Sequence, residues 1–195
     1  MGRSPEFTFT GGFFLLGAFL LLVIPIKWLL AAALAACFHE FCHYAVLKLC
    51  QCKVLALRLS ASGIYMQTDA MTPGKEFLCA LAGPIGGISL ILLCKYLPRT
   101  AICAAVYSAY NLLPVYPLDG GRCLRSAARM LFPPKASYIL CSLVECCVLL
   151  VLLFLGCYGA FAKNTGLFSL LLTSIPIIKL YKGKIPCKPW RQKVQ

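Results

Sequence analysis

Acidic residues are scarce in this chain: six Asp and Glu stand against nineteen Lys and Arg among 195 residues. Only 13% of the residues are charged, about half the share of an ordinary soluble domain, and so few charges also exclude a highly charged disordered chain. Histidine is rarer still, with two residues in the whole protein. Apolar residues take the place of the missing charges, at 61% of the chain and a mean hydropathy of +0.83. This is the composition of an integral membrane protein.

The excess of basic residues gives a net charge of +13, which by itself would suggest a nucleic-acid partner. The Lys and Arg residues are scattered between apolar runs instead of gathering on one surface, so we expect no nucleic acid. The positive-inside rule explains them better, because most fall in alternate loops. This distribution predicts that both termini are cytoplasmic, in what we expect to be a bacterial cytoplasmic membrane.

Thirteen cysteines would indicate disulfides in a small secreted protein. Most of them lie inside apolar runs, where reduced cysteine acts as a small hydrophobic residue. Cys50 and Cys52 form a C-x-C pair at the end of one run, which leaves a second metal site open as a weaker alternative.

Six apolar runs approach the length of about 20 residues that a membrane-spanning helix needs. They are Phe9–Ile26, Trp28–Leu49, Glu76–Leu97, Thr100–Leu118, Ser137–Cys157 and Asn164–Tyr181. The sequence therefore predicts an all-α polytopic membrane protein, with one membrane-embedded domain over residues 1–181 and a short basic cytoplasmic tail over 182–195.

Both histidines of the protein lie in His39-Glu40-Phe41-Cys42-His43, an H-E-x-x-H motif inside the second apolar run. Four residues apart on a helix, the two imidazoles project from one face and can share a metal, while Glu40 can reach a water beside it. Zinc with an open coordination position is the expected occupant. Ionisable residues are costly inside a membrane, so this motif is unlike a chance match in a soluble helix. We expect Cys42 to point off the histidine face and to serve packing.

A catalytic zinc site needs a third protein ligand, and Asp119 is the best candidate. It lies in the stretch from Asn111 to Gly121, whose prolines and glycines interrupt a helix at the end of the fourth run. Lipid permits such a break only where the backbone is buried in protein or lines a cavity. A surface Asp-Gly-Gly turn is the alternative. Glu145, the only acid of the fifth run, is a second candidate ligand, as in other metalloprotease classes, or it lines a water path or pairs with a basic residue.

Between the second and third runs, leucines at 55, 57 and 59 alternate with other residues, a period typical of a strand. Gly63 then permits a turn or a close backbone approach. We expect residues 54–67 to form a short re-entrant edge strand or hairpin near the site, to which an extended substrate adds by strand pairing. An interfacial loop is the alternative.

Together these motifs resemble the site-2 protease family of intramembrane zinc metalloproteases, peptidase family M50. The resemblance is carried by His39 to His43, by the N-x-x-P and L-D-G-G elements between Asn111 and Gly121, and by Ala82-Gly83-Pro84. Within the family, the pattern N-L-L-P-x-x-P-L-D-G-G is similar to that of the bacterial branch containing the sporulation stage IV factor B type protease. That protease carries a nucleotide-sensing CBS domain after its last span, and we expect none here.

The resemblance implies one zinc per chain held by His39, His43 and Asp119, with Glu40 as general base. It implies a single-span or membrane-tethered protein as substrate, in the lipid bilayer, with a homo-oligomer or a regulatory membrane protein as further possible partners. The candidate substrate-binding residues are Asn111, Pro114, Pro117 and Gly63. A non-enzymatic metal-binding scaffold or transporter is the competing interpretation, and it needs no general base at Glu40.

Overall fold

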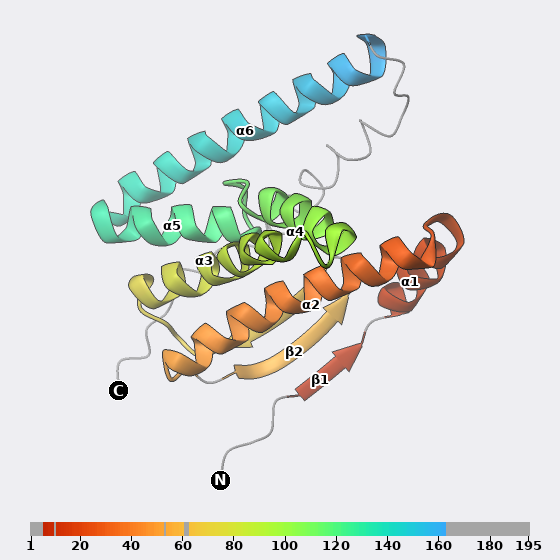
Figure 1. Ribbon diagram of the computed structural model, residues 1–195. Helices are drawn as coiled ribbons and strands as arrows, with labels where there is room; N and C mark the ends of the chain where they lie inside the picture. The colour runs from red at the N-terminus through yellow and green to blue at the C-terminus, as the bar shows by residue number, and fades with distance from the viewer. Residues whose placement is uncertain (1–5, 10, 53, 61–62, 163–195) are drawn as a thin grey trace.

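Helices make up most of the structure, a computed structural model that describes residues 6–9, 11–52, 54–60 and 63–162 (Figure 1). In chain order the elements are β1 (Glu6–Phe9), α1 (Gly11–Val23), α2 (Ile26–Leu49), β2 (Val54–Ser60), β3 (Gly63–Thr68), α3 (Pro73–Ser89), the 3₁₀ helix η1 (Leu90–Leu93), α4 (Pro98–Asn111), α5 (Asp119–Leu131) and α6 (Pro134–Ala162).

The core is built around α2, which packs against α3 and α4, while α3 also packs against α5. The buried residues of α2 recur every four positions and form one stripe along the helix. They are Ala31, Ala35, His39, His43 and Leu47. The two histidines therefore belong to the face that meets the other helices. Large apolar residues such as Leu34 and Phe41 are exposed on the remaining faces, as expected for helices surrounded by lipid.

Within the described residues, three helical stretches are long and apolar enough to cross a membrane: Ile26–Leu49, Pro73–Leu93 and Pro134–Tyr158. They correspond to the second, third and fifth predicted spans. The first and fourth predicted spans become helices of only 13 and 14 residues, α1 and α4, which are short for a bilayer. The predicted sixth span and the tail over 182–195 lie outside the described residues.

The predicted helix Thr100–Leu118 is wrong at its C-terminal end, because α4 stops at Asn111. Residues 112–118 form a tight turn that contains Pro114 and Pro117, neither of which can donate a backbone hydrogen bond. The amphipathic helix α5 follows, and the sequence analysis did not predict it.

Two glycines explain why α5 begins directly at Asp119. A Cβ atom on Gly120 would lie closer than 3.0 Å to the carbonyl of Leu112, and one on Gly121 closer than 3.0 Å to the backbone nitrogen of Tyr116. Only residues without a side chain let the first turn of α5 rest against the backbone of the preceding turn. The Asp-Gly-Gly sequence is therefore the start of a helix here and not a surface turn.

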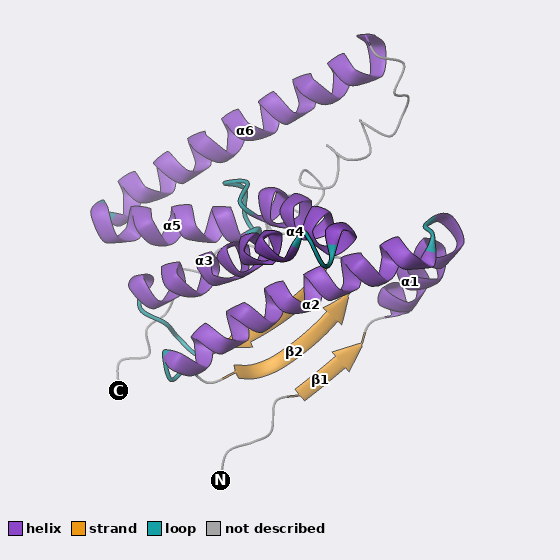
Figure 2. Cartoon of the chain, viewed as in Figure 1, coloured by secondary structure: helices purple, strands orange, loops and turns teal. Residues whose placement is uncertain are grey.

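The three strands form one sheet in the order β1-β2-β3. β2 and β3 pair antiparallel from Val54 opposite Thr68 to Ser60 opposite Gly63, in the region where the sequence predicts a strand or hairpin. β1 pairs parallel with the other side of β2, so β2 is the central strand and β3 lies at an edge of the sheet. In the view of Figure 2 the sheet lies on the opposite side of α2 from α5 and α6.

Small residues let the helices approach closely. A Cβ atom on Gly86 of α3 would lie closer than 3.0 Å to the Sγ atom of Cys42 on α2, and one on Gly87 closer than 3.0 Å to the Oγ atom of Ser108 on α4. Cys42 thus packs between helices, as predicted. Helices in lipid gain little from the hydrophobic effect, so close packing of small residues is a main source of their association.

We expect Gly87→Ala to destabilise the protein by about 1–3 kcal/mol, because the new methyl group overlaps Ser108 Oγ. Adding Ser108→Ala removes that oxygen and leaves the Cβ of residue 108 at 3.4 Å from the new Cβ of residue 87. The double variant should therefore recover most of the lost free energy of unfolding. Unfolding in detergent measures both free energies. Additive effects of the two substitutions would contradict the contact.

A buried group of two histidines and an aspartate

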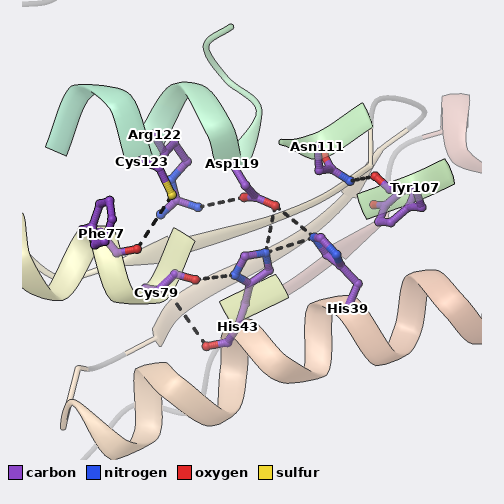
Figure 3. Close-up of polar contacts among 9 residues, drawn as sticks. All are labelled: His39, His43, Phe77, Cys79, Tyr107, Asn111, Asp119, Arg122 and Cys123. Atoms are coloured by element: carbon purple, nitrogen blue, oxygen red, sulfur yellow. Dashed lines mark hydrogen bonds and ion pairs between the residues drawn. The ribbon is translucent and has the colours of Figure 1, made fainter. Parts of the chain in front are cut away.

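Three side chains from two helices converge on one point between α2, α3, α4 and α5 (Figure 3). His39 and His43 lie one turn apart on the buried stripe of α2, and Asp119 is the first residue of α5. The Oδ2 atom of Asp119 lies 3.0 Å from Nε2 of His39 and 3.1 Å from Nε2 of His43, and the two nitrogens are 3.2 Å apart. All three residues are buried.

The orientation of His43 is set by a backbone carbonyl. Its Nδ1 atom lies 2.7 Å from the carbonyl oxygen of Cys79 on α3, which can only accept a hydrogen bond. Nδ1 must therefore carry the proton and donate it. In neutral His43 this leaves the lone pair on Nε2, which faces Asp119 and His39, as a metal ligand requires.

His39 is held by packing. The ring of Tyr107 on α4 meets the His39 ring edge to face, with the ring centroids 4.8 Å apart. The Nδ1 atom of His39 is buried and has no hydrogen-bond partner among the described residues, so Nε2 is the only ring nitrogen of His39 engaged with the group.

Asp119 uses its two oxygens differently. Oδ2 faces both imidazoles, whereas Oδ1 faces the guanidinium of Arg122, one turn further along α5, at 3.8 Å. Burial alone would raise the pKa of the Asp119 carboxyl, but its contacts with the imidazoles of His39 and His43 lower that pKa to about 2. Asp119 is therefore ionised at neutral pH.

Glu40 follows His39 on α2 and is half-buried. Its carboxylate interacts electrostatically with both imidazoles and with Asp119, and it is not part of the metal-competent group. A carboxylate at this place can accept a proton from a water bound near the histidines.

The donor set fits zinc. Two imidazole nitrogens and one carboxylate oxygen are a common protein ligand set of catalytic zinc, and two atoms that each bind a tetrahedral zinc at about 2.0–2.1 Å lie about 3.3 Å from one another. The observed separations of 3.0 to 3.2 Å match that spacing. His39, His43 and Asp119 could hold the ion. Among the described residues they are the one group of three or more such side chains that could do so, and Cys50 and Cys52 belong to no second group.

Gly83 of α3 supports this fit. A Cβ atom at Gly83 would lie closer than 3.0 Å to Nε2 of His43 and to Nε2 of His39. Because Gly83 has no side chain, the space directly beside the two donor nitrogens is free. This accounts physically for a glycine in the Ala82-Gly83-Pro84 sequence.

The other predicted residues take different places. Asn111 ends α4 near the group and donates from Nδ2 to the Tyr107 carbonyl at 3.1 Å. Pro114 and Pro117 are half-buried in the turn before Asp119, and Gly63 begins β3 opposite Ser60. Glu145 is not in the metal-competent group.

Two contributors were missed by the sequence analysis: the Cys79 carbonyl and the Arg122 guanidinium. A carbonyl acceptor has no signature in the sequence, because every residue carries one. Arg122 could have been found from its place three residues after Asp119, had α5 been predicted as a helix.

The arrangement as a whole is a bundle of apolar helices around a buried metal-competent group, together with a three-stranded sheet. No protein-family model matches the chain, and comparison with curated protein sequences gives no match. A solved structure, the site-2 protease from Methanocaldococcus jannaschii, is similar in fold, with a TM-score of 0.66 and 18% sequence identity over 93% of each chain. The chain therefore has the fold of a site-2 protease.

We expect Gly83→Ala to abolish metal binding, because its methyl group would occupy the space beside the two Nε2 atoms. Gly74→Ala is the matched control on the same helix, since a Cβ there meets only the sulfur of Met130 at 3.9 Å. Zinc content of the purified variants, measured in detergent, checks the expectation. A Gly83→Ala protein that retains zinc at the wild-type level would contradict the geometry.

Proposed function

We propose that this chain is an intramembrane zinc metalloprotease that hydrolyses a peptide bond within or near the transmembrane segment of a membrane-tethered protein. The observation that carries the proposal is the convergence of His39, His43 and Asp119 beside Glu40. The site-2 protease fold supports it. The pattern N-L-L-P-x-x-P-L-D-G-G, which begins at Asn111, supports placing this chain in the bacterial branch that contains the sporulation protease.

In this proposal His39, His43 and Asp119 bind zinc through Nε2, Nε2 and Oδ2. Zinc, when bound, supplies a Lewis acid and lowers the pKa of a bound water from about 16 towards 7. Glu40 takes the proton of the attacking water and delivers it to the nitrogen of the leaving amine. Arg122 keeps Oδ1 of Asp119 turned away from the histidines, so that Oδ2 is the oxygen offered to the ion.

The setting in a membrane follows from the three long apolar helices. The uneven distribution of Lys and Arg supports a cytoplasmic position for both termini in a bacterial cytoplasmic membrane. His39 and His43 lie on one of the three apolar helices, α2, so a bond inside or at the edge of the bilayer would be within reach of the group.

A transmembrane helix hides its peptide bonds in its own hydrogen bonds, so the protease must hold part of its substrate extended. β1 covers one side of β2, and β3 carries no further strand among the described residues. We therefore assign substrate pairing to the open edge of β3, with Gly63 at its first residue. Asn111, Pro114 and Pro117, on the path from α4 to Asp119, are the proposed contacts nearer the scissile bond.

We expect Glu40→Gln to bind about one zinc per chain and to lose cleavage by a factor of about 10²–10⁴, because the amide cannot accept the proton. Zinc content and cleavage of a panel of single-span membrane proteins in liposomes are the two measurements. Glu76→Gln is the control, since Glu76 lies in the first turn of α3 and pairs with Arg129 away from the group.

If Glu40→Gln behaves like the wild type in every functional assay while both proteins hold zinc, proteolysis is wrong. The metal-binding scaffold or transporter would then be the better interpretation.

The strand proposal is tested by two adjacent prolines, Met66→Pro and Gln67→Pro, in β3. Neighbouring N–H groups in a strand point to opposite edges, so one variant loses a bond to β2 and the other a donor at the open edge. We expect one variant to destabilise the hairpin and the other to keep zinc and thermal stability while cleavage falls. Wild-type cleavage in both variants would rule out substrate pairing at β3.

A further inference from the structure

The helix that carries Asp119 is tied to α6 by a partly buried ion pair. Nε of Arg125 donates to Oε1 of Glu145 at 3.0 Å, and Nη2 of Arg125 donates to Oε2 at 3.1 Å. Two parallel hydrogen bonds of this kind fix both the distance and the mutual orientation of the two side chains. α5 therefore has a defined position along α6.

Glu145 lies in an apolar environment. It is the only acid of α6, one of the three helices able to cross a membrane, and its side chain is 9% exposed. A charge buried in this way is strongly unfavourable without its partner, so Arg125 and Glu145 hold each other in place. Ionisable residues that persist in such helices usually serve function.

Arg125 also contacts the turn before Asp119. Its Cζ atom lies 4.1 Å from the centre of the Tyr116 ring, within the range of a cation–π interaction. The backbone of Tyr116 in turn rests against Gly121, on the first turn of α5. One guanidinium thus connects the carboxylate of α6 to the segment that leads into Asp119.

We propose that Glu145 and Arg125 are positioning residues for Asp119, an inference that rests on the zinc site of the proposed function. Neither residue is part of the metal-competent group. Together they hold Tyr116, and with it the start of α5, where Oδ2 of Asp119 reaches both imidazoles. This gives Glu145, whose role the sequence leaves open, a task distinct from metal ligation.

The test is the zinc affinity of the full chain in detergent, measured by competition with a chelator. We expect Glu145→Gln and Tyr116→Leu to weaken zinc binding about 10- to 100-fold, the usual effect of losing a residue that orients a ligand. Tyr116→Phe keeps the aromatic face and should stay within about twofold of the wild type. The visible spectrum of bound Co²⁺ gives a second readout, since it responds to a displaced ligand in the first two variants alone.

Arg129→Gln is the matched control. It breaks another ion pair of α5, between Arg129 and Glu76, which is more exposed and further from Asp119. Its zinc affinity should equal that of the wild type. The unfolding temperature of each metal-free variant separates lost stability from lost zinc affinity. If Glu145→Gln does not fold, the comparison of Tyr116→Leu with Tyr116→Phe tests the positioning role.

The outcomes separate the two proposals. A wild type that binds no zinc overturns the proposed function and the positioning role with it. A wild type that binds zinc, together with Glu145→Gln and Tyr116→Leu variants of unchanged affinity, overturns the positioning role alone. An equal loss in Arg129→Gln also overturns it, because any broken ion pair on α5 would then have the same effect.

Discussion

The meeting of two imidazoles with one carboxylate in a buried position is the interaction on which the rest of the structure depends. Polar groups in such a place are unfavourable without partners, and here Asp119 faces both Nε2 atoms while the Cys79 carbonyl accepts the Nδ1–H of His43. Asp119 lies 76 residues from His43 and 80 residues from His39 in the chain. No local preference can bring them within 3.1 Å. The helices between α2 and α5 must therefore be packed so that these atoms meet.

Small residues make that packing possible and also keep the group open. Gly86 and Gly87 bring α3 against α2 and α4, and Gly120 with Gly121 brings α5 against the turn before it. In lipid such close approach replaces the hydrophobic drive that assembles a soluble core. Gly83 has a different role, because the space it leaves lies beside the donor nitrogens themselves. Substitutions among these glycines should therefore divide into those that loosen the helix packing and those that fill the space beside the donor nitrogens.

Much of the site could be predicted from the sequence, because its signals are local. His39 and His43 stand one helical turn apart, and Asp119 follows a helix break that lipid would otherwise forbid. The rest depends on contacts between distant segments. A partner such as the Cys79 carbonyl has no residue type to reveal it, and Glu145 meets Arg125 only because α5 folds back along α6. The helices were predicted where the apolar runs are long. α5 was missed because Asp-Gly-Gly is typical of a turn. β1 was missed because four residues are too few to show the alternation of a strand.

The amphipathic helix α5 resolves a conflict that the proposed chemistry creates. Hydrolysis needs water and charge at the group, whereas apolar helices exclude both. α5 is the polar helix beside the group, and Arg122, Arg125 and Arg129 continue along it from Asp119, with side chains that are 31%, 32% and 43% exposed. Each arginine faces a different acid: Asp119 itself, Glu145 of α6 and Glu76 of α3. Directional ion pairs can thus fix the position of a polar helix among apolar ones, where nonspecific apolar packing would let it slide. They fix with it the position of Asp119, the first residue of the helix.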